Sequence, residues 1–261
     1  MGARDIDLFS LALLLVFLVP VLLLSGKFKL SLNKTILWAT LRMMAQLAFV
    51  GVYLKYLFKF NMPWVNVLYI LIMIAIASYT VLKTSKLKLS KLFLPIFISI
   101  LLPVGTILMF INSFVVRIEN VFDAKYMIPI CGMLLGNSMR NNIIGLSSFY
   151  SGLKENEKTY LYTIALGGSR LQALKPFFRE SFVASINPIL ASMATIGIVS
   201  LPGMMTGQIL GGSIPVVAIK YQIIIMLAIF YTQFFSVFLS LFFSIKLGFD
   251  DFDVLRKELL C

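Results

Sequence analysis

Long apolar segments recur along the whole chain and constrain its fold more than any other feature. The hydrocarbon core of a bilayer is about 30 Å thick, so a spanning helix needs about 20 mostly apolar residues. Seven segments meet or approach this length: 8–24, 36–58, 64–82, 92–111, 126–146, 182–201 and 221–245. Only 13% of the residues are charged, against about 25% in soluble domains. The sequence therefore predicts an all-α, polytopic integral membrane protein that forms a single domain over residues 1–261.

The distribution of basic residues predicts the orientation of the chain. Cytoplasmic loops of membrane proteins carry an excess of Lys and Arg. With seven alternating spans, one set of connecting segments holds 15 basic residues and the other holds 4. The smaller set is Arg4, Lys59, Arg117 and Lys125. We therefore expect the N-terminus outside an inner membrane and the C-terminus in the cytoplasm, and we attribute the net charge of +12 to contact with anionic lipid headgroups rather than nucleic acid.

The rarity of reactive side chains excludes most enzyme classes. The chain has 11 Asp and Glu residues and no His, which excludes Ser-His-Asp catalysis, histidine-ligated haem and the usual zinc hydrolases. A Gly-x-x-x-x-Gly-Lys-Ser/Thr loop is also missing, so we expect no ATPase activity and no cofactor in this chain itself. Cys131 is expected in the membrane and Cys261 in the cytoplasm, so no disulfide is expected between them.

One long hydrophilic segment, residues 150–181, is predicted to form a cytoplasmic helical hairpin between the fifth and sixth spans. Its first helix is expected from about Glu155 to Leu166 and ends at a pair of glycines. Ser169 can cap a second helix, whose apolar positions recur at spacings of three and four: Leu171, Leu174, Phe177 and Phe178. Periodicity leaves two interpretations open. The apolar face lies on the bilayer interface, or a cytoplasmic partner pushes against it.

Motifs in and around this hairpin resemble a known family of transporters. The residues Glu157, Ala165, Gly167, Gly168, Ser169 and Pro176 resemble the cytoplasmic coupling loop of ATP-binding-cassette (ABC) permeases, although the usual Glu-Ala-Ala opening reads Glu-Lys-Thr here. The blocks GMLLGNSM at 132–139 and GIVSLPGMMTGQIL at 197–210 resemble signature blocks of the FetB-type iron-export permease family. This resemblance covers the chain from about residue 131 by sequence, and its first half by hydropathy layout and length.

The resemblance implies a permease subunit of an exporter, with iron as the substrate by the family name. It further implies self-association into a dimer or higher assembly, and a separate cytoplasmic ATPase subunit that holds ATP and Mg. A gradient-driven secondary transporter is the alternative, and the lack of an intramembrane carboxylate argues against it. A membrane scaffold that only recruits a partner is a third interpretation.

Polar and small residues within the predicted spans are candidates for a transport pathway or for helix packing. In the fifth span, Gly132 and Gly136 are four residues apart and could let another backbone approach closely. Asn137 and Asn141 form a polar face near the cytoplasmic end of that span, together with Arg140, and Arg42 and Gln46 share a face of the second span. The two arginines could instead extend to the headgroups.

The segment 202–215 holds two prolines and four glycines, and it is predicted to be a broken helix or re-entrant turn. We expect it to line the outer part of the pathway or a dimer contact, with an external loop as the alternative. Its candidate residues are Gly203, Met204, Met205, Gly207 and Gln208. Metal ligands are not predicted, because iron prefers oxygen or imidazole and the spans offer mainly methionine and Cys131. A hard cation would need asparagine and backbone oxygens, or would travel as a chelate.

Overall fold

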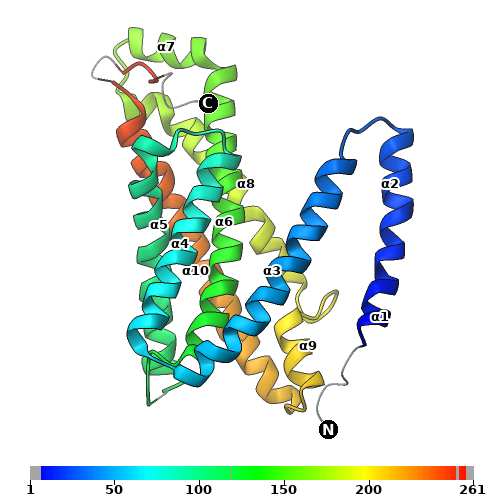
Figure 1. The fold of residues 1–261 in the computed structure, drawn as a ribbon. Coiled ribbons are helices and arrows are strands. Elements are labelled where there is room, and N and C mark those ends of the chain that lie inside the picture. The colour runs from blue at the N-terminus through cyan, green and yellow to red at the C-terminus, as the bar shows by residue number, and fades with distance from the viewer. Residues whose placement is uncertain (1–6, 118, 251–252, 257–261) are drawn as a thin grey trace.

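The computed structural model describes residues 7–117, 119–250 and 253–256, and this part of the chain is all-helical. Helix accounts for 83% of these described residues, and no strand occurs among them. In order, the elements are α1 (Leu8–Leu13), η1 (Leu14–Phe17), α2 (Leu18–Lys27), α3 (Asn33–Phe60), α4 (Pro63–Thr84), α5 (Leu89–Phe110), η2 (Ile111–Val115), α6 (Ala124–Glu155), α7 (Glu157–Ala165), α8 (Arg170–Thr195), α9 (Gly203–Leu210) and α10 (Pro215–Gly248). The long helices stand side by side, and α7 lies across one end of them (Figure 1).

Four helices in the described part of the chain are long and apolar enough to cross a membrane. They are α3, α4, α5 continued by η2, and α10, and they contain the predicted second, third, fourth and seventh spans. The first predicted span is divided by the 3₁₀ turn η1 into α1 and α2. The fifth and sixth fall in α6 and α8, which are more polar. Seven spans therefore stay a prediction, as does the placement of the chain termini, because Arg4 and Cys261 lie outside the described residues.

The main bundle consists of α4, α5, α6, α8 and α10, and its interior is filled with branched aliphatic side chains. Ile74, Ile96, Leu134 and Leu241 are completely buried there, each on a different helix. Lipid tails are as apolar as leucine, so close packing and interhelical hydrogen bonds hold such helices together rather than the hydrophobic effect. The helices α6 and α10 run in the same direction through the bundle (Figure 1).

Helices α2 and α3 form a pair that stands apart from the main bundle (Figure 1). None of the apolar window of α3 is buried. The pair is attached near the end of α3, where Asn61 takes the left-handed conformation and its Oδ1 accepts from the backbone N–H of Ala124 (2.9 Å) and from Nδ2 of Asn66 (3.1 Å). The exposed face of α3 is therefore free to meet lipid or another protein chain.

The predicted hairpin is continuous with its neighbouring helices, which corrects its expected boundaries. The second hairpin helix and the sixth span are a single helix, α8, which contains Pro176 and Pro188 and ends at Thr195 rather than at residue 201. It ends there because Ile196 is extended and Gly197 has a φ of 84°, which only glycine adopts readily. On the other side, α6 continues to Glu155, and only Asn156 separates it from α7.

Candidate functional site

The turn between α7 and α8 needs both of its glycines. Gly167 has a φ of 86°, and its N–H donates to the carbonyl of Ile164 (2.9 Å), while the N–H of Gly168 donates to that of Thr163 (3.0 Å). These two hydrogen bonds form a Schellman motif, which pairs the free carbonyls at a helix end. A Cβ on Gly168 would lie 2.8 Å from the carbonyl oxygen of Thr163. The predicted end of the first hairpin helix is thereby confirmed.

Ser169 caps α8, as the sequence predicts. Its Oγ accepts from the backbone N–H of Gln172 (3.3 Å), and the Gln172 side chain accepts from the N–H of Ser169 (2.9 Å), which completes a capping box. The other candidate coupling residues surround this turn. Glu157 lies in the first turn of α7, Ala165 ends that helix, and Pro176 is exposed in the second turn of α8.

The hairpin has one buried face and an apolar tip. Tyr160, Leu174 and Phe177 are buried against the bundle. We define the tip as the exposed apolar side chains near the turn: Leu161, Tyr162, Leu166 and Leu171. Leu166 and Leu171 are each 70% exposed. A tip of this kind can insert into a groove of a partner protein.

Two side chains join the hairpin to the segment that follows α10. The hydroxyl of Tyr160 donates to the carbonyl of Asp253 (2.6 Å), and its ring centroid lies 5.6 Å from that of Phe249. The guanidinium of Arg170 forms an ion pair with Asp253, donates to the carbonyl of Asp250 (2.9 Å) and lies over the Phe249 ring. We call this contact the joint. These contacts connect the hairpin directly to the residues at and after the end of α10.

The environment of the joint keeps Tyr160 protonated. Its side chain is only 2% exposed. Burial, and then the neighbouring Asp253 carboxylate, raise the pKa of Tyr160 to about 12, which Arg170 opposes in part. A tyrosine with the ordinary pKa of about 10 is already neutral at physiological pH, and this shift moves its ionisation further from that range, so the phenol stays a hydrogen-bond donor there. Sequence reasoning missed this joint because Tyr160 and Asp253 are 93 positions apart. The available signal was the cluster of aspartates after α10 in a chain poor in acidic residues.

A line of polar contacts joins α6 to α10 inside the bundle. Nδ2 of Asn142 donates to Oγ of Ser236 (2.9 Å), and the hydroxyls of Tyr150 and Ser244 are 2.5 Å apart. Both pairs are separated by 94 positions, so the two parallel helices keep one register over eight residues, about 12 Å. We call these four residues the polar seam. Gly145 lies between the pairs, and a Cβ there would lie 3.0 Å from Cγ1 of Val237.

Several buried polar atoms near the seam have no hydrogen-bond partner among the described residues. They are Oγ of Ser138, Nδ2 of Asn141, Oδ1 of Asn142, Oε1 of Gln233 and Oγ of Ser240. Leaving a buried polar atom unpaired costs about 1–3 kcal/mol. The sequence pointed to Asn141 in this group, whereas Ser138, Asn142 and Gln233 were missed because polar residues are also frequent at helix contacts.

Of the remaining candidate pathway residues in the predicted second and fifth spans, only some lie close to one another in the structure. Gln46, Gly132 and Gly136 line a hollow of about 480 Å³ between α3, α4 and α6. Among the described residues, no other backbone approaches the two glycines, since the nearest atom to a Cβ on Gly132 would be Cε of Met73 at 3.7 Å and a Cβ on Gly136 would meet nothing within 4 Å. Nδ2 of Asn137 donates to the carbonyl of Met133 on its own helix (2.8 Å). The side chains of Arg42 and Arg140 are exposed.

The segment 202–215 is interrupted, as predicted. The short helix α9 ends before Gly211, Gly212 has a φ of 99°, and Pro215 begins α10. Met204 and Gln208 line a hollow of about 530 Å³ with residues of α6 and α10. Met205 lines a separate hollow of about 490 Å³ between the end of α8 and α10. At Gly203 and Gly207 a Cβ would meet open space. Among the described residues, no group of three or more His, Cys, Asp or Glu side chains could hold a metal ion.

The helices and the site define a multi-pass α-helical membrane protein with a projecting hairpin at one end. The chain belongs to the family described as "Uncharacterised protein family (UPF0014)", whose profile matches residues 8–249. It is 34% identical over 251 residues to the "Probable iron export permease protein FetB" of Escherichia coli, covering 94% of this chain and 93% of that protein. The resemblance to the FetB-type family is thus confirmed.

Two further relatives come from distant organisms. The chain is 31% identical to the "UPF0014 membrane protein YjkA" of Bacillus subtilis, over 84% of this chain and 86% of that protein. It is 33% identical to the "Protein ALUMINUM SENSITIVE 3" of Arabidopsis thaliana, over 81% of this chain and 76% of that protein. No solved structure matches the chain at a significant level.

Proposed function

We propose that this chain is the membrane permease subunit of an ABC exporter, driven by a separate cytoplasmic ATPase subunit. The observation that carries the proposal is the hairpin, with its exposed apolar tip on one side and its joint to the end of α10 on the other. The name of the E. coli relative supports the permease role. ATP and Mg belong to the partner subunit, and this chain supplies the docking surface.

The mechanism follows from the contacts between the helices. Movement of the ATPase would displace the tip, and Tyr160 and Arg170 would carry that displacement to Asp253 and α10. The polar seam then couples α10 to α6, whose last residue lies next to the hairpin. Two packing arrangements of these helices would give inward-open and outward-open states, each favoured by one nucleotide state of the partner.

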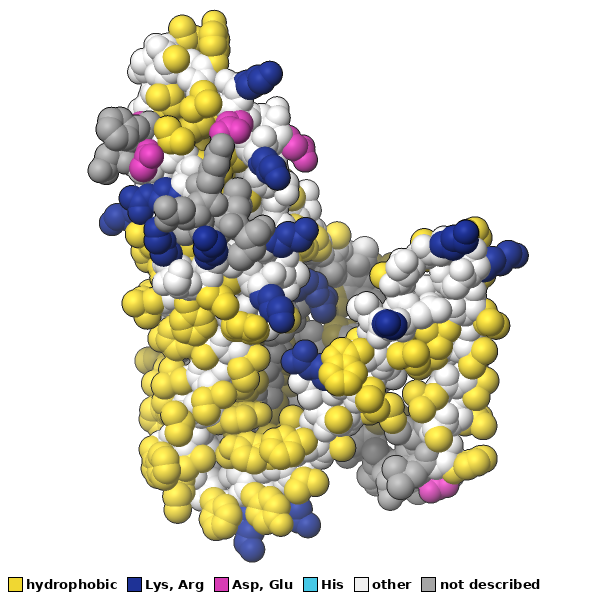
Figure 2. Space-filling model, turned by 45° about the horizontal axis from the view of Figure 1, so that its top comes forward, with side chains coloured by type: hydrophobic (Ala, Val, Ile, Leu, Met, Phe, Trp, Pro, Cys, Tyr) yellow, Lys and Arg dark blue, Asp and Glu magenta, His cyan; other side chains and the backbone are white. Residues whose placement is uncertain are grey.

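The topology that fits this mechanism has seven spans. Helix α6 has 32 residues, and at 1.5 Å per residue it exceeds the roughly 30 Å hydrocarbon core. The first turns of the 26-residue α8 belong to the hairpin, so the sixth span would also need residues 196–201 that follow this helix. Many polar side chains of the two helices, such as Ser138, Asn142 and Ser185, point into the bundle rather than toward lipid. Dark blue Lys and Arg side chains gather between the hairpin and the apolar body of the molecule (Figure 2), which favours a cytoplasmic hairpin.

The proposed substrate is a metal ion or a small metal complex. The relatives are named for iron export and for aluminium sensitivity. The unpaired buried atoms near the seam are mostly neutral oxygens, from Ser138, Asn142, Gln233 and Ser240. Such oxygens bind a hard cation weakly in the absence of carboxylates, which suits an exporter that must release its cargo.

The test is purification of the full chain from its native membrane, together with an ATPase assay. We expect a nucleotide-binding subunit to co-purify, and its hydrolysis to increase when ferrous iron is added. Leu166→Glu at the tip should abolish co-purification, because it would place a charge in the apolar groove of the ATPase that is proposed to receive the tip. Leu210→Glu is the matched control, because Leu210 is similarly exposed and lies at the end of α9, at the other end of the molecule; this variant should leave co-purification unchanged.

Two outcomes would contradict the proposal. If the unchanged chain purifies without an ATPase and moves metal along an ion gradient in vesicles, it is a secondary transporter. If it recruits an ATPase but vesicles show no ATP-dependent flux of any metal tested, the metal substrate is wrong while the coupling role stands.

A further inference from the structure

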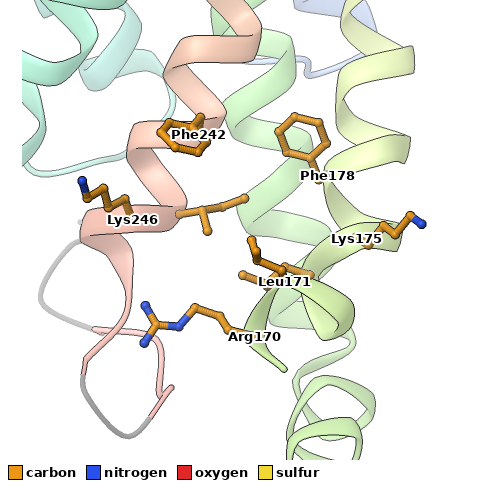
Figure 3. A pocket seen from close by; sticks show the side chains of 8 residues that line it. Arg170, Leu171, Lys175, Phe178, Phe242 and Lys246 are labelled. Atoms are coloured by element: carbon orange, nitrogen blue, oxygen red, sulfur yellow. The ribbon is translucent and has the colours of Figure 1, made fainter. Parts of the chain in front are cut away.

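A groove of about 500 Å³ lies between the first turns of α8 and the last turns of α10, at the hairpin end of the bundle. It is lined by Arg170, Leu171, Leu174, Lys175, Phe178, Phe242, Ile245 and Lys246. Figure 3 shows the rings of Phe178 and Phe242 on the two facing helices, and Arg170 at the end of the groove away from these rings. Lys175 and Lys246 stand on opposite sides, with their ammonium groups turned away from its centre (Figure 3).

The apolar part of the groove continues along the contact between α8 and α10. Phe178 packs edge-on against Phe238, with 5.8 Å between the ring centroids, and Phe182 meets Phe234 in the same way at 4.9 Å. Phe242 stacks on Phe238 at 6.5 Å. Phe238 and Phe242 remain 41% and 48% exposed. The result is a partly open aromatic strip, which leads from the groove toward the middle of the bundle and suits a hydrocarbon chain.

The charged part of the groove carries uncompensated positive charge. The Arg170 guanidinium is paired with Asp253, so its charge is largely neutralised. Lys175 and Lys246 are exposed and have no acidic partner among the described residues. A lysine ammonium sits on a flexible four-carbon stem, so both groups can swing toward an anion at the mouth of the groove. The two lysines and the aromatic strip together present an amphipathic surface.

We propose that this groove is a binding site for one anionic phospholipid, of the phosphatidylglycerol class. Its phosphate lies between Lys175 and Lys246, and an acyl chain lies along Phe178 and Phe242. Basic pockets between membrane helices on the cytoplasmic side commonly hold such headgroups. The bound lipid bridges α8 to α10 at the base of the hairpin, next to the joint. The site does not depend on an ATPase partner, so its test is separate from that of the proposed function.

The experiment is native mass spectrometry of the full chain released from nanodiscs. The nanodiscs contain equal amounts of phosphatidylglycerol and phosphatidylcholine with identical acyl chains. We expect the chain to retain phosphatidylglycerol preferentially. Each basic residue near an anionic headgroup contributes about a factor of five, so K175Q/K246Q should lower that preference by about 10- to 25-fold. Soluble glycerophosphoglycerol should fail to compete, because it lacks the chain that fills the strip.

The matched control is K83Q/K88Q, which removes two exposed lysines at the same end of the molecule but outside the groove. It should keep the preference of the unchanged chain. Equal retention of the two lipids, or an equal loss in K83Q/K88Q, would overturn the proposal in favour of general surface charge. Competition by soluble glycerophosphoglycerol would reassign the groove to a free anion.

A second measurement needs no variant. Phosphatidylglycerol with a photoreactive group in its acyl chain should label peptides that contain Phe178 or Phe242. Labelling confined to other helices, such as the exposed α3, would contradict the site even if the lysine variants proved unstable.

Discussion

The side chains of Asn142 and Ser236 are 94 positions apart in the chain and are hydrogen-bonded inside the bundle, with Nδ2 2.9 Å from Oγ. The same donor also reaches the carbonyl of Ser138 on its own helix (2.8 Å). Asn142 therefore links α10 to the backbone of α6. Together with the contact between Tyr150 and Ser244, it sets the register of the two parallel helices through which the hairpin would act.

A double-mutant cycle on Asn142→Val and Ser236→Ala should reveal this link. Interhelical hydrogen bonds in membranes contribute about 0.6 kcal/mol on average and up to about 1.7 kcal/mol. We expect a coupling energy within this range, measured by reversible unfolding in mixed micelles. Strictly additive losses would mean that the two side chains do not interact in the folded protein.

Gly145→Ala should destabilise the bundle by about 1–3 kcal/mol, because overpacking a tight core costs this much. The new Cβ would lie 3.0 Å from Cγ1 of Val237 and 3.5 Å from Cβ of Ser185. Val237→Ala in the same chain should restore part of the loss by removing the first clash. The readout is the midpoint of thermal unfolding in detergent. If the double variant instead lost as much stability as the two single variants added together, the contact between residues 145 and 237 would be contradicted.

Replacing Gly168 with alanine should loosen the hairpin, because the added Cβ meets the backbone oxygen of Thr163 at 2.8 Å. We expect faster hydrogen exchange at the end of α7 and a loss of more than about 1 kcal/mol in local stability. Gly136→Ala is the control. Its Cβ would meet nothing, and alanine is favoured over glycine in a helix by about 1 kcal/mol. Equal protection in both variants would argue against the tight turn.

Tyr160→Phe should weaken the joint by about 1 kcal/mol, because the hydrogen bond to Asp253 is lost while the ring remains. The folded pKa of about 12 lies above the usual value of about 10, so folding favours the neutral phenol. The contribution of this group is therefore complete below pH 10 and is lost as the pH rises toward 12. We expect the same deficit at every pH between about 6 and 9, measured by hydrogen exchange in 253–256.

The control for Tyr160 is Tyr162→Phe, since Tyr162 is 67% exposed at the tip. This variant should behave like the unchanged chain in exchange experiments. A deficit at Tyr160→Phe that varied across the neutral range would point to a group other than the phenol.

The orientation can be tested by cysteine labelling. The chain has two cysteines, so a variant lacking both provides a clean background. Tyr162→Cys at the tip should react with an impermeant reagent only from the cytoplasmic side. Asn120→Cys, in the connection between η2 and α6, should react only from the outside. Reaction of both from the same side would rule out the topology with seven spans.

Much of the local structure could be predicted because it depends on neighbouring residues. The apolar lengths of α3, α4, α5 and α10 meet the requirement for spanning a membrane. The Gly167–Gly168 turn and the Ser169 cap follow from backbone conformation and from a side chain three residues away. By contrast, α8 passes through two prolines without ending, because packing of its buried face outweighs their local cost.

The sequence by itself determined the membrane class, the position of most helices and the fine structure of the hairpin turn. The tertiary structure alone decided that Asn142 is hydrogen-bonded to Ser236, that Tyr160 is hydrogen-bonded to Asp253, and that α3 stands apart from the main bundle. The physical reason is the sequence separation over which each kind of interaction acts. Hydropathy and capping act within a few residues, whereas the register of packed helices depends on the shapes and polar groups of surfaces that lie 90 or more positions apart in the chain.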